Sequence, residues 1–316
     1  MKIVFFGSSD FSIPCFEFLA ASSRHELAAV VTTPDRPKGR GLGLQANPIK
    51  QRSEKKGVRV FEPEKLSGSE AQKEIQAMKP EVFVVASYGK LIPGSWLEIP
   101  SKAALNVHPS LLPKYRGAAP IAWQILNGDR EVGVSIAEVT KELDAGDIFT
   151  QIRIPMDSLD TAESLTQKLS ELGRKALEDV LTKLEQGTLQ RTPQDSSQSN
   201  YARKLTKEDG HLKLSEPARE LEWKIRAFHP WPGAFVDYRG KPLRIVEARC
   251  DSIACAEAEP GVLLALTPEG ELRIQTGKGS LRISKVQLPG RRVITGREFA
   301  NGERLKLGFT FKSLAQ

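Results

Sequence analysis

The sequence has few of the residues and patterns that mark several classes of protein. Its 316 residues include three cysteines, Cys15, Cys250 and Cys255, and four histidines. Three cysteines make no framework of disulfides, and none lies near a histidine at metal-ligand spacing. No apolar run approaches the roughly 20 residues of a membrane span. These absences predict a cytoplasmic protein that has no membrane segment and holds no metal.

The glycine pattern of a dinucleotide site is also missing. That fingerprint needs three spaced glycines at the first strand–helix turn. The chain has Gly7 alone in FFGSSD, and Gly41 and Gly43 lie in a later loop. The pattern therefore argues against a nicotinamide enzyme.

The first 190 residues have no excess of charge. They contain 24 Lys and Arg and 24 Asp and Glu, whereas residues 191–316 contain 22 and 15. The whole net charge of +7 therefore lies in the last part of the chain. This asymmetry favours two modules, of which the second is attracted to a polyanion. A basic surface without a partner is the alternative.

The apolar runs of the first part alternate with helical patterns. Strands are predicted at residues 2–6, 27–31, 81–87 and 104–107, and helices at 11–21, 69–79, 116–128 and 161–186. Three of the strands are nearly continuous apolar runs, which is typical of strands buried on both faces. The alternation predicts an α/β domain over residues 1–189, built on a Rossmann-like, mostly parallel sheet.

A polar segment separates this domain from a β-rich one. Residues 190–207 have almost no apolar content and no period, so we predict a linker there. Beyond it, short strands are predicted at residues 233–238, 243–249, 261–266, 271–276 and 280–288. Their spacing predicts a small antiparallel barrel over residues 208–316.

The octapeptide NVHPSLLP carries the first candidate catalytic pair. It follows a predicted buried strand and therefore emerges at the carboxyl edge of the sheet, where open α/β folds bind ligands. Asn106 and His108 are two residues apart and face the same way on an extended strand. Pro109 keeps His108 away from helical dihedral angles. The pair could donate hydrogen bonds to an oxyanion, or His108 could accept a proton.

A carboxylate that orients the imidazole is expected in LDAGDIF, residues 143–149. Gly146 permits a tight turn there, and either Asp144 or Asp147 could reach the cleft. An Asn–His–Asp set at a sheet edge suits transfer or hydrolysis at a carbonyl. A plain turn is the alternative for each motif taken alone.

Several motifs together resemble the folate-dependent formyltransferases. NVHPSLLPKYRGAAPI (106–121) is similar to the signature of that family. FFGSSDFSIPCFEFL, VVASYGKLIP (84–93), TTPDRPKGRGLGL (32–44) and KIRAFHPWPGAF (224–235) resemble its other segments in the same order. The resemblance implies a formyltransferase domain followed by a barrel similar to an OB fold. It also implies transfer of formyl from 10-formyltetrahydrofolate to the amino group of methionine on initiator tRNA.

The same resemblance assigns site residues. Asn106, His108 and Asp144 match the catalytic Asn, His and Asp of the family. The folate-binding stretch is matched by Ser110, Leu111, Leu112 and Pro113. Contact with RNA is expected from Arg36, Lys38 and Arg40 in the basic loop, where Arg40 matches the arginine that reaches the acceptor end. We expect a monomer whose partners are the folate and the tRNA.

Three other functions fit parts of the pattern. A related enzyme of the same fold could formylate a purine precursor nucleotide or an amino sugar. The same triad with water as acceptor would make a formyltetrahydrofolate hydrolase. A non-enzymatic RNA-binding protein would use the basic barrel alone.

Overall fold

The computed structural model describes residues 1–37, 44–45, 47–253 and 258–313. The chain forms two compact units. The first contains residues Met1–Pro120, Glu131–Met156 and Leu165–Arg203. The second contains Ile121–Arg130, Asp157–Ser164 and the chain from Lys204.

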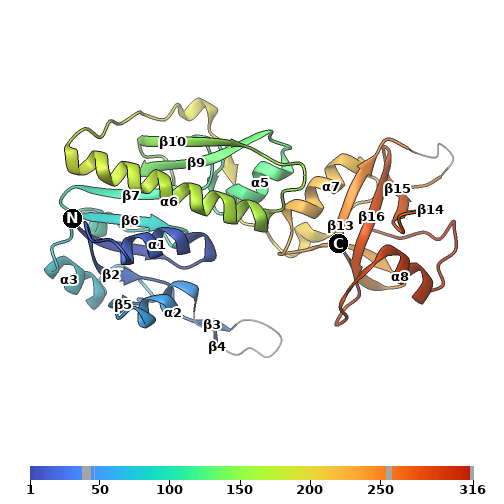
Figure 1. The fold of residues 1–316 in the computed structure, drawn as a ribbon, viewed down its shortest axis with the longest axis horizontal. Coiled ribbons are helices and arrows are strands. Elements are labelled where there is room, and N and C mark those ends of the chain that lie inside the picture. Colours follow the sequence, from blue (N-terminus) through green and yellow to red (C-terminus); the bar gives the residue numbers. More distant parts are fainter. Residues whose placement is uncertain (38–43, 46, 254–257, 314–316) are drawn as a thin grey trace. The chain divides into compact units, whose positions relative to one another are not determined.

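The first unit is built on a seven-stranded sheet (Figure 1). Its strands, in spatial order, are β10 (Ile148–Pro155), β9 (Glu131–Glu138), β7 (Ala103–His108), β6 (Val82–Ala86), β1 (Lys2–Gly7), β2 (Glu26–Val31) and β5 (Val60–Phe61). The pairs from β7 to β5 are parallel, whereas β9 runs antiparallel to both β7 and β10. The predicted mostly parallel sheet is confirmed.

Helices cover this sheet. They are α1 (Ile13–Ala20), α2 (Pro48–Lys55), α3 (Glu70–Ala77), the short α4 (Gly94–Leu97) and the long α6 (Ala162–Gln186). Figure 1 shows α6 lying along the strands near β7 and β9. A Cβ on Gly173 would lie 2.7 Å from Val107 Cγ1, so this glycine lets α6 approach β7 closely. The four helices predicted from the sequence are present, with the third confined to α5 (Pro120–Leu126).

Residues 192–202, called the strap below, belong to the first unit and pair with other parts of it. Thr192 and Ile148 exchange two backbone hydrogen bonds of 2.8 and 2.9 Å. The two-residue strand β11 (Tyr201–Ala202) pairs in parallel with β8 (Arg116–Gly117). The strap is therefore held by backbone hydrogen bonds, although it lies within the predicted linker. Backbone pairing needs no apolar period, so the sequence pattern did not reveal the pairing of the strap. The predicted limits of the two domains stay a prediction.

The second unit contains an antiparallel sheet. Its strands are β12 (Ala234–Tyr238), β13 (Lys241–Asp251), β14 (Leu263–Leu266), β15 (Leu272–Gln275), β16 (Ser280–Gln287) and β17 (Val293–Thr295), with helices α7 (Ala218–Ala227) and α8 (Gly296–Gly302). The strand order is β12-β13-β16-β15-β14. The five strands predicted for this part are all present, whereas α7, α8 and β17 were not predicted.

A C-terminal segment closes this sheet. Phe311 donates its N–H to Gly261 O just before β14, and Asp237 of β12 exchanges backbone hydrogen bonds with Lys312. Residues 308–312 therefore bridge both edges of the sheet, which is compatible with the predicted barrel. Leu221, Ile225 and Phe299 of the two helices pack into its core. The likeness to an OB fold stays a prediction.

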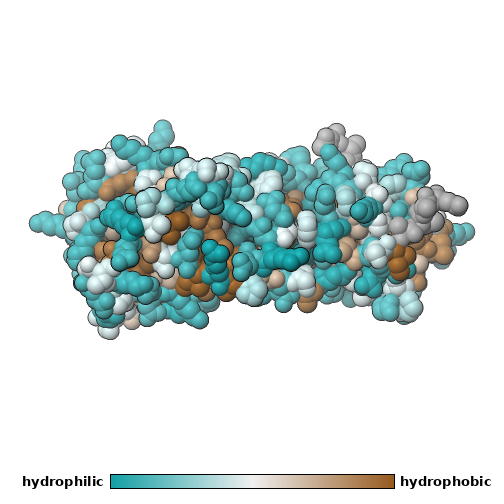
Figure 2. Space-filling view, turned by 90° about the horizontal axis from the view of Figure 1, so that it is seen from above, coloured by the Kyte–Doolittle hydropathy of each residue, from teal (hydrophilic) through white to brown (hydrophobic). Residues whose placement is uncertain are grey.

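The surface shown in Figure 2 is mostly hydrophilic, with smaller hydrophobic patches. Among the exposed apolar side chains are Leu91, Leu143 and Trp231, which are 67%, 40% and 55% exposed. Scattered residues of this kind are common on protein surfaces. Among the helices of the described residues, none is long and apolar enough to span a membrane.

Candidate active site

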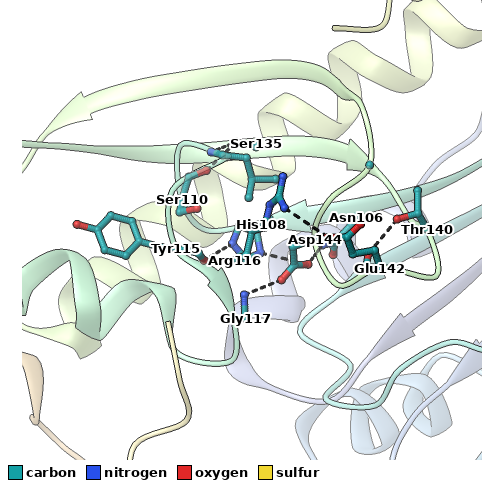
Figure 3. A network of polar contacts seen from close by, with 12 residues as sticks. Asn106, His108, Ser110, Tyr115, Arg116, Gly117, Ser135, Thr140, Glu142 and Asp144 are labelled. Atoms are coloured by element: carbon teal, nitrogen blue, oxygen red, sulfur yellow. Dashed lines mark hydrogen bonds and ion pairs between the residues drawn. The ribbon is translucent and has the colours of Figure 1, made fainter. Parts of the chain in front are cut away.

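Two polar side chains lie at the carboxyl end of the central strand β7. Asn106 stands opposite Val85 of β6, and His108 stands opposite Ser135 of β9. Because side chains alternate along a strand, Asn106 and His108 lie on one face. His108 is buried, at 4% exposure, and Asn106 is half-buried. The structure thus places the predicted pair together at this edge of the sheet (Figure 3).

Asp144 completes the cluster from the turn between β9 and β10. Its Oδ1 accepts the Asn106 amide N–H at 2.9 Å and lies 3.7 Å from His108 Nδ1. Its Oδ2 accepts the Gly117 N–H at 2.8 Å. Asp147 instead supplies its backbone carbonyl to the N–H of Glu138 at 2.9 Å. Of the two aspartates left open by the residue pattern, Asp144 is therefore the one whose carboxylate meets the pair (Figure 3).

Close backbone packing fixes the turn that carries Asp144. A Cβ on Gly146 would lie 2.1 Å from Glu138 O, so only glycine fits there. Asp144 itself has φ +53°. This left-handed conformation costs a residue with a Cβ about 1–2 kcal/mol. Aspartate tolerates it better than most residues, and here its carboxylate has three partners to hold it.

The His108 ring has different neighbours at its two nitrogens. Nε2 lies 2.9 Å from the carbonyl oxygen of Tyr115. Since a carbonyl only accepts hydrogen bonds, this contact assigns a proton to Nε2. In the neutral ring Nδ1 is then the unprotonated nitrogen, and it is the one that faces Asp144. A proton arriving at the ring would therefore be taken up at Nδ1.

The SLLP stretch, predicted to bind folate, is tightly held. Ser110 Oγ donates to Lys114 O at 2.6 Å, and the side chains of Ser110 and Leu112 are buried. Leu111 and Pro113 are partly exposed. The stretch is thus a rigid wall whose exposed parts come from alternate residues. Its role toward folate stays a prediction.

Residues that the sequence analysis missed support this stretch and the Asp144 turn. Ser135 Oγ donates to Ser110 O at 2.7 Å and accepts the Leu112 N–H at 3.0 Å. Gln151 Nε2 donates to Leu112 O at 2.8 Å. Gln194 of the strap donates to Asp144 O. Ser135 is a polar residue inside an apolar strand, a signal that could have been found, whereas Gln194 lies in a polar run that carries none.

The structure tests little of the predicted RNA-binding set. Arg36 lies in the two-residue strand β3 (Arg36–Pro37), which pairs with β4 (Leu44–Gln45). Lys38 and Arg40 lie outside the described residues. The role of these three residues toward RNA stays a prediction.

No group of three or more His, Cys, Asp or Glu within the described ranges could hold a metal ion. The cluster itself offers one imidazole, one carboxylate and one amide. The arrangement therefore offers hydrogen-bond donors and one proton acceptor for chemistry at a carbonyl carbon.

Family comparison places both parts of the chain in one family. Residues 1–181 match the formyl transferase family and residues 204–304 match its C-terminal domain. A methionyl-tRNA formyltransferase of Hydrogenovibrio crunogenus is 39% identical, over 96% of this chain and 97% of that protein. One of Roseiflexus castenholzii is 40% identical, over 98% of each.

Solved structures share the fold at lower identity. An N-formyltransferase of Helicobacter canadensis, in complex with folinic acid and dTDP-3-aminofucose, aligns with a TM-score of 0.67 at 17% identity, over 91% of this chain and all of that one. HypX of Aquifex aeolicus, in complex with tetrahydrofolic acid, aligns with a TM-score of 0.64 at 19% identity, over 100% of this chain and 51% of that one. The matches over both parts and the full-length relatives at 39–40% identity agree. The chain belongs to the formyl transferase family.

Proposed function

We propose that this protein transfers the formyl group of 10-formyltetrahydrofolate to the α-amino group of methionine esterified to initiator tRNA. The observation that carries the proposal is the contact of Asn106, His108 and Asp144 at the carboxyl end of β7. The acceptor is inferred from the full-length relatives named methionyl-tRNA formyltransferase. The product would serve the initiation of translation.

The reaction joins the amine nitrogen to the formyl carbon and breaks the bond from that carbon to N10 of the donor. Between these two events the formyl oxygen carries negative charge. Asn106 gives one amide proton to Asp144 and has a second that can be donated to this oxygen. A donor aimed at a developing oxyanion typically contributes about 10²–10³ in rate.

His108 would move the proton. The attacking nitrogen must lose a proton and the departing N10 must gain one, so a single group can serve both steps. Nδ1 is suited because Nε2 is engaged with the Tyr115 carbonyl. The negative charge of Asp144, 3.7 Å from Nδ1, stabilises the cationic ring that forms in between. Proton transfer by a positioned group contributes about 10²–10⁴ in rate.

The amine itself needs little help to lose its proton. An α-amino group has a pKa of about 7.7–8.0, so a useful fraction is neutral near pH 7. No covalent intermediate with the protein is required. We therefore propose a direct attack through a tetrahedral species.

The loops after β6 and β9 carry exposed apolar side chains of a kind that suits the ring system of the folate donor. Leu143 precedes Asp144 and is 40% exposed, and Leu91 in the loop after β6 is 67% exposed. Leu111 and Pro113 of the SLLP stretch are partly exposed apolar side chains as well. We propose that the donor binds along Ser110–Pro113 and the loop after β6.

The basic part of the chain would bind the tRNA. Residues 191–316 hold the whole net charge of +7. Lysine and arginine contacts to phosphate position a nucleic acid without reading its sequence. We propose that Arg36, Lys38 and Arg40 meet the acceptor end, and that the protein works as a monomer in the cytoplasm.

The deciding experiment compares acceptors at a fixed concentration of 10-formyltetrahydrofolate. Formyl transfer is measured to methionyl-tRNA, to an amino-sugar nucleotide and to water. The relatives of known fold include a protein bound to dTDP-3-aminofucose, which makes the sugar the second candidate acceptor. Transfer to methionyl-tRNA should exceed both others by orders of magnitude. Formate release without transfer would instead make the protein a hydrolase.

A further inference from the structure

The strap sends one side chain to the turn that carries Asp144. Gln194 Nε2 donates to Asp144 O at 2.9 Å and to Gly146 O at 2.7 Å. Its Oε1 accepts from Nε and Nη2 of Arg116, at 3.1 and 2.8 Å. Both amide N–H groups and both lone pairs of the side chain are thereby used. Gln194 is half-buried, whereas the other residues of 191–200 are exposed.

Together with the Gly117 contact, these hydrogen bonds form a closed ring of contacts through Gln194, Arg116 and Asp144. Arg116 is 8% exposed, and the next residue, Gly117, donates its N–H to Asp144 Oδ2. Arg116 N–H in turn donates to Asn200 O of the strap at 3.0 Å. Asp144 is thus held at its backbone carbonyl through Gln194, and at its carboxylate through the chain that follows Arg116. Gln194 is the side chain that connects the two.

The contacts of Gln194 matter because the distance between Asp144 and His108 depends on where the turn places the carboxylate. Its backbone is in the left-handed region, at φ +53°. Its carboxylate lies 3.7 Å from His108 Nδ1, so a shift of the turn by a few tenths of an ångström decides whether the two groups come within hydrogen-bond distance. We propose that Gln194 is a positioning residue, which holds Asp144 in register with His108 and Asn106. This inference rests on the proposed function of that cluster.

Two substitutions at Gln194 distinguish its N–H donors to the turn from its acceptor for Arg116. Gln194→Glu would keep the acceptor for Arg116 but lose both donors to the turn. Gln194→Met keeps the length and removes all polar contacts. Gln198 gives a matched control, because it is exposed on the same strap and donates to Asp195 Oδ2 at 2.8 Å. Gln198→Glu therefore makes the same chemical change away from the turn.

We expect Gln194→Glu and Gln194→Met to lower kcat for formyl transfer by about 10–100-fold, because a misplacement near 1 Å can cost that much. The KM values for donor and tRNA should change by less than about 3-fold, since neither substrate touches Gln194 in this account. Gln198→Glu should stay within about 2-fold of the original protein. A loss confined to KM, or kcat unchanged in both Gln194 variants, would overturn the proposal.

A double-mutant cycle with Asp144→Asn shows whether Gln194 acts through Asp144. If it does, Gln194→Glu should lower kcat by less than about 2-fold in the Asp144→Asn background, because residues of one network are non-additive. Losses that multiply would mean a general structural role and would contradict the proposal. The proposed function is tested separately by Asp144→Asn alone, whose full activity would refute the role of Asp144. Gln194→Met serves the same cycle if the Gln194→Glu variant does not fold.

Discussion

Two clusters of polar side chains, one in each unit, differ in the backbone that carries them and in the chemistry they offer to another molecule. In the second unit, Glu222 and Arg226 of α7 are 7% and 8% exposed. Glu222 Oε1 lies 3.8 Å from Arg226 Nε and 3.6 Å from Arg249 Nη1, and Oε2 accepts the Cys250 N–H at 3.0 Å. Arg226 Nη1 donates to the backbone carbonyl of Asp160 at 2.8 Å.

The Glu222 cluster stands on a regular helix and strand, where one carboxylate lies within 4 Å of two guanidinium groups. The cluster of Asn106, His108 and Asp144 stands at a strand end and on a left-handed turn. It retains a proton acceptor at Nδ1 and a second amide N–H. Strained backbone and unused hydrogen-bonding capacity are typical of a site that acts on another molecule. Ion pairs between regular helices and strands are typical of a cluster that stabilises the fold.

The sharpest test of this contrast is His108→Ala. Removing the imidazole should lower formyl transfer by about 10²–10⁴-fold, because proton transfer by a positioned group is lost. Single-turnover transfer to methionyl-tRNA measures this. His229→Ala is the control, since His229 pairs with Glu163 in the second unit, at 3.4 Å. Transfer by His108→Ala within a few-fold of the original would refute the role of His108.

At Glu222 we expect a substitution to lower the stability of the fold, whereas at His108 we expect it to lower formyl transfer. Glu222→Ala leaves Arg226 and Arg249 without their carboxylate and should lower the free energy of unfolding by about 3–5 kcal/mol. Denaturant unfolding of the full chain measures this. Glu178→Ala, which breaks an exposed pair with Arg174 on α6, should lower it by about 1 kcal/mol or less. Equal losses in the two variants would show that burial does not distinguish the pairs.

The comparison extends to charge, because residues 1–190 are neutral overall and residues 191–316 carry +7. Affinity for methionyl-tRNA should fall by at least about tenfold between 50 and 200 mM salt, since bound counterions are released from the phosphates. The affinity for the folate donor should change far less. Filter binding and fluorescence titration measure the two. An affinity for tRNA that does not change with salt would contradict a basic RNA-binding surface.

A contact between His25 and Glu185 in the first unit should give the smallest effect, on the dependence of stability on pH. His25 Nδ1 lies 3.2 Å from Glu185 Oε1. Burial lowers the pKa of His25, against the raising influence of Glu185. As pH falls through the unfolded value of about 6.5, the unfolded chain binds more protons than the folded one, so stability decreases. The decrease ends below the folded pKa.

His25→Gln should therefore reduce the dependence of the free energy of unfolding on pH between pH 7.5 and 5.5, whatever it does to the absolute stability. Denaturant unfolding at several pH values measures the slope. An unchanged slope would mean that His25 does not titrate differently in the two states.

Much of this fold could be predicted, and particular residues show where prediction stops. Continuous apolar runs identified β2, β6 and β7 because strands buried on both faces need them. Strand β9 was missed, since Gly133 and Ser135 interrupt its apolar run. A Cβ on Gly133 would lie 2.2 Å from Ile152 O, so packing against β10, and not strand propensity, explains that glycine.

In the candidate site, too, some residues could be predicted from the sequence and others depended on the folded chain. Asn106 and His108 could be paired from their spacing, because a strand fixes which residues share a face. Asp144 could not be separated from Asp147 by the residue pattern, since the choice depends on a left-handed φ that no local rule requires. Gln194 was out of reach altogether. Its partners Asp144 and Arg116 are 50 and 78 residues away in sequence, and only the folded chain brings them together.

The most direct test of the central claim is a mass measurement of the product. The protein is mixed with 10-formyltetrahydrofolate and methionyl-tRNA, and formyl-methionyl-tRNA and tetrahydrofolate are counted in the same reaction. The account predicts equal amounts of the two products, and their loss in both His108→Ala and Asp144→Asn. Tetrahydrofolate formed without formyl-methionyl-tRNA, or transfer that survives both substitutions, would contradict it.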